Sequence, residues 1–348
     1  MKKKVLLLIS VLLVILLFAG CGGTGEKVYV YCYGDYFDPD LIGQFEEETG
    51  IEVIVDTYDT CEEMYPVIKN NSASYDVICP SDYMIERMIG EDLLAEINFD
   101  NVSNIKNIGD KYLEMSRDFD PENKYSVPHT YGTAGILYNP EMVGDKVIDS
   151  WTNLWDEGLE GEILMQDSIR DTFMVAEKIL GYSLNTVNED ELKEATELLI
   201  EQKPLVYKYV NDSARDLLSS EAAAIGVIWN GEYLYCKELN DKLEFVVPKE
   251  GTQFFIDAWV IAKTAENKEN AEEWINFMCR EDVGKQNFDY LTYSTPNIAA
   301  QALINEDILN DESVFPTDET LDNCEVLKDL GPDGNELYSE YWKKFKAE

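Results

Sequence analysis

The chain has 348 residues, of which 28 are Lys or Arg and 69 are Asp or Glu, and its formal charge is −41. A field of this sign repels phosphate backbones and anionic membrane surfaces, so it excludes nucleic acid as a partner. The hydrophobic share of 45% excludes disorder and can fill sizeable cores, and this length favours two domains or lobes.

The first 20 residues read as a signal peptide that is removed. Lys2, Lys3 and Lys4 precede a run without charges, Val5 to Ala19, in which Ser10 is the one polar residue. The run is too short for the roughly 20 residues of a membrane-spanning helix and fits the core of a signal peptide. The following LFAGC, Leu17 to Cys21, resembles the lipobox of bacterial lipoproteins, in which the cysteine takes a diacylglycerol. We therefore expect Cys21 to be lipidated, residues 21–26 to form a flexible tether, and the folded part to lie outside the cytoplasm, anchored to the cell membrane.

Strands and helices alternate after the tether, which predicts an α/β fold with a mostly parallel sheet flanked by helices. Gly50 ends the first helix, and Thr60 with Glu63 forms a capping-box pattern at the start of the second. The predicted strands are Val28 to Cys32, Ile51 to Thr57 and Tyr75 to Cys79, and the predicted helices are Asp38 to Thr49 and Cys61 to about Lys69.

Two extended segments, Ser126 to Tyr138 and Phe254 to Ala262, read as crossings to and from a second lobe. Gly132 is expected to divide the first crossing into two short pieces. The second lobe repeats the alternating pattern, and an amphipathic helix from Asn270 to Cys279 follows the return crossing. Its predicted strands are Glu162 to Gln166, Ala223 to Trp229 and Leu243 to Val247, and its predicted helices are Ser168 to Leu180 and Glu189 to Glu201.

Aromatic and acidic residues gather at the predicted strand ends and crossings, where ligands collect in parallel sheets. Ring faces attract cations and stack on methylenes, and carboxylates bind ammonium groups through charge-assisted hydrogen bonds. Together they suit an elongated aliphatic polyamine. Simpler readings stay open, namely turn chemistry at the strand ends, core packing of Trp229 and Phe255, and a capping box between Ser168 and Asp171. The candidates are Tyr33, Asp35, Tyr36, Tyr83, Asp171, Trp229, Phe255, Asp257 and Tyr293.

Histidine and cysteine chemistry is restricted in this chain. A single histidine, His129, excludes multi-histidine metal sites, and we read it as structural. We predict neither a metal nor a cofactor. Six cysteines follow Cys21 without any C-x-x-C pair, so buried free thiols are expected, although a Cys32 to Cys79 disulfide is conceivable.

Six segments together resemble the spermidine/putrescine-binding proteins of bacterial polyamine ABC transporters, over about Val28 to Phe345. The resemblance implies a two-lobed, type II periplasmic-binding-protein-like fold with crossing strands, a ligand in the cleft and delivery to a membrane permease. The segments are VYVYCYGDYF (28–37), YDVICPSDY (75–83), DSIRDTF (167–173), IWNG (228–231), FFID (254–257) and YSTPN (293–297).

The resemblance also implies roles for single residues. Tyr33 stands where the family usually has a stacking Trp, Phe255 replaces a frequent Trp, and Ser81 joins the cleft wall. Asp35, Asp171 and Asp257 match carboxylates that engage amines. Tyr36, Tyr83, Trp229 and Tyr293 match ligand-contacting or cleft-wall rings. Ser168 and Leu327 depart from the Asp and Gln of spermidine-preferring members, which leaves the preferred polyamine open.

The sequence thus predicts a monomeric, lipid-anchored receptor that binds a polyamine and does not catalyse. The alternatives are a receptor for thiamine, a sugar or another solute, a surface hydrolase using two carboxylates, and an adhesion module. The expected lobes comprise residues 27–133 with 256–300, and residues 134–255 with 301–348.

Overall fold

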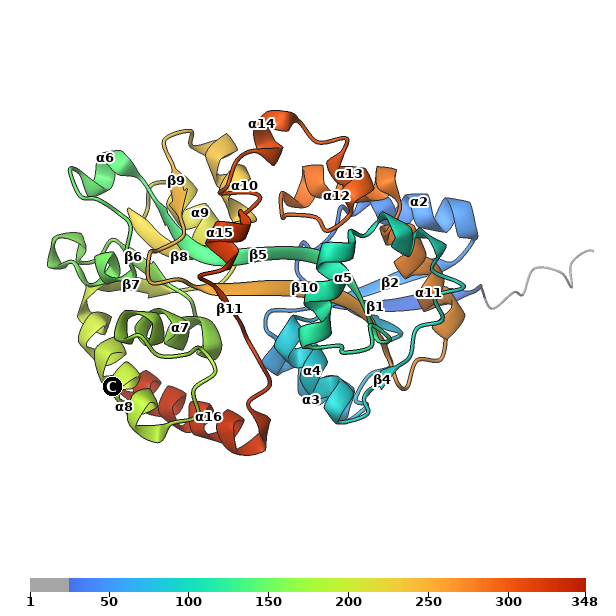
Figure 1. Cartoon of the computed structure of the whole chain (residues 1–348), viewed down its shortest axis with the longest axis horizontal. Helices are drawn as coiled ribbons and strands as arrows, with labels where there is room; N and C mark the ends of the chain where they lie inside the picture. Colours follow the sequence, from blue (N-terminus) through green and yellow to red (C-terminus); the bar gives the residue numbers. More distant parts are fainter. Residues whose placement is uncertain (1–24) are drawn as a thin grey trace, which may run out of the picture.

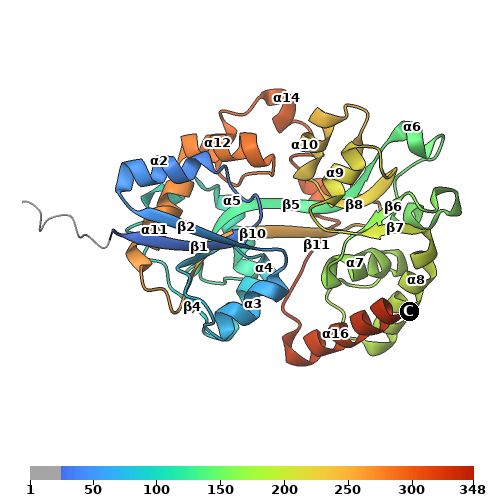
Figure 2. The same ribbon diagram turned by 180° about the vertical axis from the view of Figure 1, so that it is seen from behind.

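The computed structural model describes residues 25–348. The predicted signal peptide and Cys21, with most of the tether, lie outside this range. Two α/β lobes stand side by side, and three segments run between them (Figure 1). The view from behind shows helices covering both faces of each lobe (Figure 2).

The first lobe is built on the parallel strands β2, β1 and β3, with β10 antiparallel to β3. Val30 of β1 lies between Val55 and Val77, so the centre of this sheet is a buried row of β-branched residues. Its elements are β1 (Lys27–Tyr33), α2 (Asp40–Thr49), β2 (Glu52–Tyr58), α3 (Cys61–Lys69), β3 (Val77–Ile78), α4 (Asp82–Gly90), β4 (Leu94–Ala95), α5 (Asp110–Met115), α11 (Lys268–Met278), α12 (Glu281–Leu291) and α13 (Ile298–Gln301), with 3₁₀ turns η1 (Ser103–Asn107) and η2 (Ser116–Asp118).

The second lobe repeats this plan with the parallel strands β7, β6 and β8, next to which β5 runs antiparallel. The C-terminal helix α16 packs against α8 and α7. Its elements are α6 (Pro140–Val143), β6 (Ile163–Met165), α7 (Ile169–Leu180), α8 (Glu189–Gln202), β7 (Val206–Tyr209), α9 (Ala214–Ser219), β8 (Ile225–Trp229), α10 (Glu232–Leu239), β9 (Glu244–Val246) and α16 (Gly331–Ala347), with 3₁₀ turns η3 (Trp151–Trp155), η4 (Glu157–Leu159) and η5 (Lys203–Leu205).

Three segments join the lobes, namely β5 (Ser126–Tyr138), β10 (Gln253–Ala262) and a strap through β11 (Glu325–Val326) that leads to α16. The short helices α14 (Glu306–Leu309) and α15 (Asp318–Leu321) precede the strap. Strands β5 and β10 pair antiparallel, with a register shift at Asp257, so this carboxylate lies at an irregularity between the lobes.

The fold is the type II periplasmic-binding-protein arrangement that was expected, but two local expectations were wrong. Gly132 does not interrupt the first crossing, because β5 runs straight through it. An added Cβ there would approach Asn230 Oδ1 to 2.1 Å, so glycine is needed for packing rather than for a break. Only half of the capping box forms. Thr60 Oγ1 accepts from Glu63 N, but Glu63 receives the backbone N–H of Asp59 instead.

The six cysteines within the described chain are free, as expected, and no disulfide joins Cys32 to Cys79 there. His129 is buried with its ring edge-on to Tyr36 and tilted against Trp259. Its Nε2 lies 3.2 Å from the Tyr36 carbonyl oxygen, and burial lowers the pKa of His129 to about 4. A neutral imidazole in an aromatic core fits the structural role predicted for it.

A buried carboxyl group fixes helix α16 to the second lobe. Because of this group, we predict that the free energy of unfolding of the protein depends on pH. Tyr338 donates to Glu177 Oε1 at 2.6 Å, and burial raises the pKa of Glu177 to about 8. Between these two pKa values Glu177 is therefore protonated in the folded protein and ionised in the unfolded chain, where its pKa is the ordinary 4.5. This contribution to stability is fully present below that value and is lost as the pH rises through about 8.

Glutamine is always neutral and can still accept a hydrogen bond from Tyr338. The change in the free energy of unfolding caused by Glu177→Gln should therefore be more favourable at pH 8.5 than at pH 5, by on the order of 3 kcal/mol. Urea unfolding at the two pH values measures the difference. Glu194→Gln is the matched control, since Glu194 accepts from Tyr182 at 2.6 Å on the surface. Equal effects of Glu177→Gln at both pH values would contradict the prediction.

Candidate functional site

A cleft of about 260 Å³ lies between the two lobes, and all ten candidate binding residues from the sequence line it. They come from the ends of β1, β3 and β8, from α4 and α7, from β10 and from the loop after α12. The structure therefore brings all of them to one place, and that they bind a ligand remains a prediction. The ten are Tyr33, Asp35, Tyr36, Ser81, Tyr83, Asp171, Trp229, Phe255, Asp257 and Tyr293.

Aromatic rings form a continuous wall along the cleft. Tyr33 and Tyr36 meet edge to face with ring centroids 5.1 Å apart, and Tyr36 meets Tyr293 in the same way at 6.4 Å. Tyr293 then contacts Phe255 at 6.5 Å. The Tyr293 ring lies over Gly231, where an added Cβ would come within 2.2 Å of it. Such a wall can pack against methylenes and attract a positive charge.

Asp257 is the most deeply buried candidate carboxylate, at 5% exposed. Tyr36 donates its hydroxyl to Oδ2, and Thr130 Oγ1 lies 2.8 Å from the same hydroxyl oxygen. Oδ1 has no hydrogen-bond partner within the described chain. Burial raises the pKa of Asp257 to about 6, against the opposing effects of the Ser81 and Tyr36 hydroxyls. An unpaired buried carboxylate oxygen is costly unless a donor or cation arrives, so this atom is a candidate for a ligand contact.

Asp171 lies at the start of α7, facing the first lobe. Ser168 makes no capping bond to the helix, so the capping-box alternative is wrong. Instead, Gln253 Nε2 donates to Asp171 Oδ1 at 2.8 Å. Tyr83 on α4 donates to Glu62 Oε1 at 3.0 Å. Burial raises the pKa of both Asp171 and Glu62, and the negative charge of Asp171 raises the pKa of Glu62 further.

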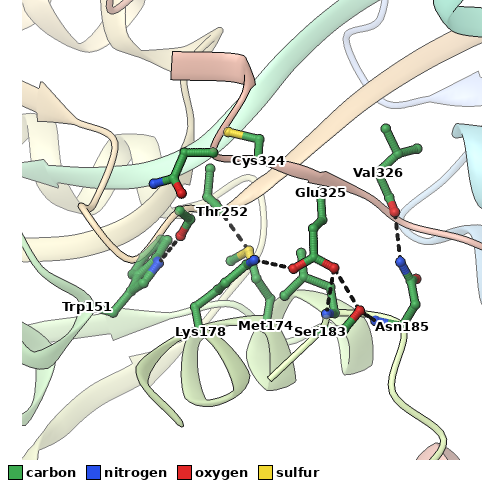
Figure 3. A network of polar contacts seen from close by, with 12 residues as sticks. Trp151, Met174, Lys178, Ser183, Asn185, Thr252, Cys324, Glu325 and Val326 are labelled. Atoms are coloured by element: carbon green, nitrogen blue, oxygen red, sulfur yellow. Dashed lines mark hydrogen bonds and ion pairs between the residues drawn. The ribbon is translucent and has the colours of Figure 1, made fainter. Parts of the chain in front are cut away.

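The strap is fixed to the second lobe by the network in Figure 3. Lys178 of α7 forms an ion pair with Glu325, and Ser183 donates to the other carboxylate oxygen at 2.7 Å. Asn185 Nδ2 donates to the Val326 carbonyl at 2.9 Å. These contacts hold the adjacent Leu327 at the cleft, which it lines. The cleft therefore has an apolar residue at this point of its wall.

Seven charged cleft residues are absent from the candidates of the sequence reasoning, namely Asp59, Glu62, Asp82, Arg170, Asp212, Arg215 and Glu232. Glu62 and Glu232 occupy the first turns of α3 and α10, directly after strands that end at the cleft. That position was the available signal for both. Arg215 lies on α9, a six-residue helix without a clear periodic pattern, and nothing in the sequence pointed to it.

Metal binding has no support in residues 25–348, where no group of three or more His, Cys, Asp or Glu side chains is placed to hold an ion. Over the same residues, no helix is both long and apolar enough to cross a membrane. The site is thus an acidic, aromatic cleft between two lobes, which is the architecture of a solute receptor.

The family comparison agrees with this class. Residues 40–316 match the model of the bacterial extracellular solute-binding protein family, and the chain belongs to that family. Its members bind solutes, so this chain is a binding protein and not an enzyme, which removes the surface hydrolase from the alternatives.

Individual relatives are similar over nearly their whole length. The spermidine/putrescine-binding periplasmic protein of Escherichia coli is 35% identical over 323 residues, covering 92% of both chains. The same-named protein of Salmonella typhimurium is 34% identical and covers 94% of both. Among solved structures, a Listeria monocytogenes protein assigned as a spermidine/putrescine ABC transporter is 37% identical with a TM-score of 0.88, covering 92% of this chain and 99% of its own.

Proposed function

We propose that this chain captures an aliphatic polyamine, putrescine or spermidine, in the cleft between its lobes. The observation that carries the proposal is the buried Asp257 carboxylate, whose Oδ1 has no partner in the described chain and which lies beside a wall of aromatic rings. An ammonium group supplies the missing donor and charge, and the rings pack on the methylenes. The names of the relatives, which are spermidine/putrescine-binding proteins, support the same ligand class.

The cleft also discriminates against neutral solutes. Eight carboxylates and two guanidinium groups line it among the described residues. A sugar would leave Asp257 Oδ1 with a neutral donor and would not compensate the remaining charge. A dication satisfies both needs, with each charge-assisted hydrogen bond contributing about 1.5–3 kcal/mol. The carboxylates are Asp35, Asp59, Glu62, Asp82, Asp171, Asp212, Glu232 and Asp257.

Isothermal titration calorimetry tests the ligand class. We expect putrescine or spermidine to bind with a Kd of about 1 μM or tighter, which corresponds to about −8 kcal/mol, and thiamine and glucose to give no measurable heat. A panel of the same compounds in a thermal-shift experiment provides a second readout, because a ligand that binds the folded state raises the Tm. Binding of thiamine or glucose without either amine would overturn the proposal.

Delivery is proposed to pass from this chain to an ABC transporter permease. Closure of the lobes about β5, β10 and the strap would bring Asp171 and Asp257 together around the ligand and remove water from the ammonium groups, which strengthens both contacts. The proposed lobes are residues 27–133 with 256–300 and residues 134–255 with 301–348, acting as a monomer. Uptake of labelled putrescine by cells lacking this chain should fall.

Lipid anchoring at Cys21 is the remaining part of the proposal and is supported by the LFAGC motif. Mass spectrometry of the protein from its host should find the chain beginning at Cys21 with an added diacylglycerol. Cys21→Ala is expected to prevent that addition while leaving polyamine affinity unchanged, because the tether precedes β1. A mature N-terminus without lipid would contradict the anchor and leave the binding proposal intact.

A further inference from the structure

The two guanidinium groups that line the cleft, among the described residues, have different tasks. Arg170 is 6% exposed and donates from Nη2 to the Leu184 carbonyl at 2.9 Å and to Asn185 Oδ1 at 3.0 Å. Its Nη1 donates to the Lys328 carbonyl at 3.1 Å. Arg170 therefore holds the strap onto the second lobe, and its donors are not directed at the cleft carboxylates.

Arg215 pairs with cleft carboxylates from both lobes. Its Nη2 lies 3.1 Å from Asp35 Oδ2 on the first lobe, and its Nη1 lies 3.4 Å from Glu232 Oε2 on the second. The ring of Tyr235 lies 4.8 Å below the guanidinium carbon. The side chains of Arg215 and Glu232 are only 25% and 12% exposed. One internal cation thus already occupies this end of the cleft, which we call the Asp35 end, and offsets part of the negative charge there.

Asp257, Glu62 and Asp171 have neutral hydrogen-bond partners, and the nearby charge of Arg170 lowers the pKa of Glu62 and Asp171 without a hydrogen bond to either. Asp257 accepts from the Tyr36 hydroxyl, Glu62 from the Tyr83 hydroxyl and Asp171 from the Gln253 amide. The buried Asp257 Oδ1 has no partner among the described residues. At two positions, therefore, no cation of the described chain is hydrogen-bonded to a carboxylate, one at Asp257 and one between Glu62 and Asp171.

We propose that Arg215 is a specificity-determining residue, which fills the Asp35 end of the cleft in place of a third ammonium group and so makes the site prefer a diamine to a triamine. This inference rests on the proposed polyamine function. A diamine can place its two charges at Asp257 and at the Glu62 and Asp171 pair. A triamine brings a third charge toward a guanidinium, which repels it, and toward two carboxylates with which that guanidinium already pairs.

Calorimetry with putrescine and spermidine tests the inference on three forms of the protein. The wild-type chain is expected to bind putrescine at least tenfold more tightly than spermidine. Arg215→Gln frees Asp35 and Glu232 and should change the ratio of the two affinities at least tenfold in favour of spermidine. The control is Arg117→Gln, which removes the same charge from an exposed ion pair with Glu114 and should leave the ratio unchanged.

Arg215→Lys separates the effect of the positive charge from the effect of the substitution itself. Lysine keeps the charge at the Asp35 end, so the affinity ratio should stay within threefold of the wild-type ratio. A ratio that moves as far in Arg215→Lys as in Arg215→Gln would overturn the inference. A wild-type preference for spermidine, or an unchanged affinity ratio in folded Arg215→Gln, would do the same while leaving the polyamine function standing. If the wild-type chain binds neither amine, the proposed function itself fails.

Discussion

Asp257→Asn should weaken putrescine binding by about 10- to 100-fold at pH 7.5, corresponding to about 1.4–2.7 kcal/mol. Asparagine keeps the shape of the side chain and can still accept the Tyr36 hydroxyl. The substitution removes the negative charge. In place of the carboxylate oxygen Oδ1 it puts either an amide N–H, which donates, or a neutral amide oxygen, which accepts more weakly. Calorimetry on the two proteins measures the change.

The stability of this variant separates a binding defect from misfolding. The raised pKa of Asp257, about 6, means that ionisation of this group disfavours the folded state, since the unfolded carboxyl ionises at 3.8. The neutral variant removes that cost, so its Tm at pH 7.5 should not fall. Asp100→Asn, an exposed change outside the cleft, is the matched control and should bind normally. Unchanged affinity in Asp257→Asn would remove Asp257 from the site.

Putrescine affinity should also fall steeply with pH, by about tenfold at pH 5 and about 100-fold at pH 4 relative to pH 7.5. The ligand keeps its charge over this range, so the protein is the partner that titrates. Asp257 must be ionised to hold an ammonium group, and in the empty cleft it takes up a proton below about pH 6. Binding near that pH should therefore release a proton.

The proton release can be measured by calorimetry at pH 6 in buffers of different ionisation enthalpy, where the observed heat should vary with the buffer. Asp171 and the buried Asp82 lie near Asp257, and burial raises the pKa of each, so they contribute to the same loss of affinity in acid. Asp257→Asn should flatten the profile between pH 5 and 7.5. A wild-type affinity that stays constant over this interval would contradict the assignment.

Much of the fold could be predicted because each lobe alternates strands and helices with clear boundaries. Gly50 ends α2 in a left-handed conformation, and Thr60 caps α3, as their residue types indicate. The predicted strand at Tyr75 to Cys79 shortens to two residues, Val77 and Ile78, because only these pair with β1. The continuity of β5 was missed because Gly132 is needed to make room for the side chain of Asn230, a residue that is remote in sequence.

Cleft residues could be predicted where the end of one strand carries several aromatic and acidic residues. They could not be predicted where a segment contributes a single residue to the cleft. Tyr33, Asp35 and Tyr36 share the end of β1, so the aromatic and acidic pattern was visible locally. Glu62, Arg215 and Glu232 each stand alone in an ordinary helix. With 69 acidic residues, a single carboxylate carries no signal until folding brings it opposite a partner. The pairing of Asp35 with Arg215 is such a case, because it becomes visible only in the folded structure.

The most direct measurement is a crystal structure of residues 25–348 with putrescine. The account predicts one nitrogen within about 3 Å of Asp257 Oδ1, the methylenes against the aromatic wall, and the second nitrogen between Glu62 and Asp171. Putrescine bound on an outer surface, or a cleft that stays empty at saturating amine, would contradict it.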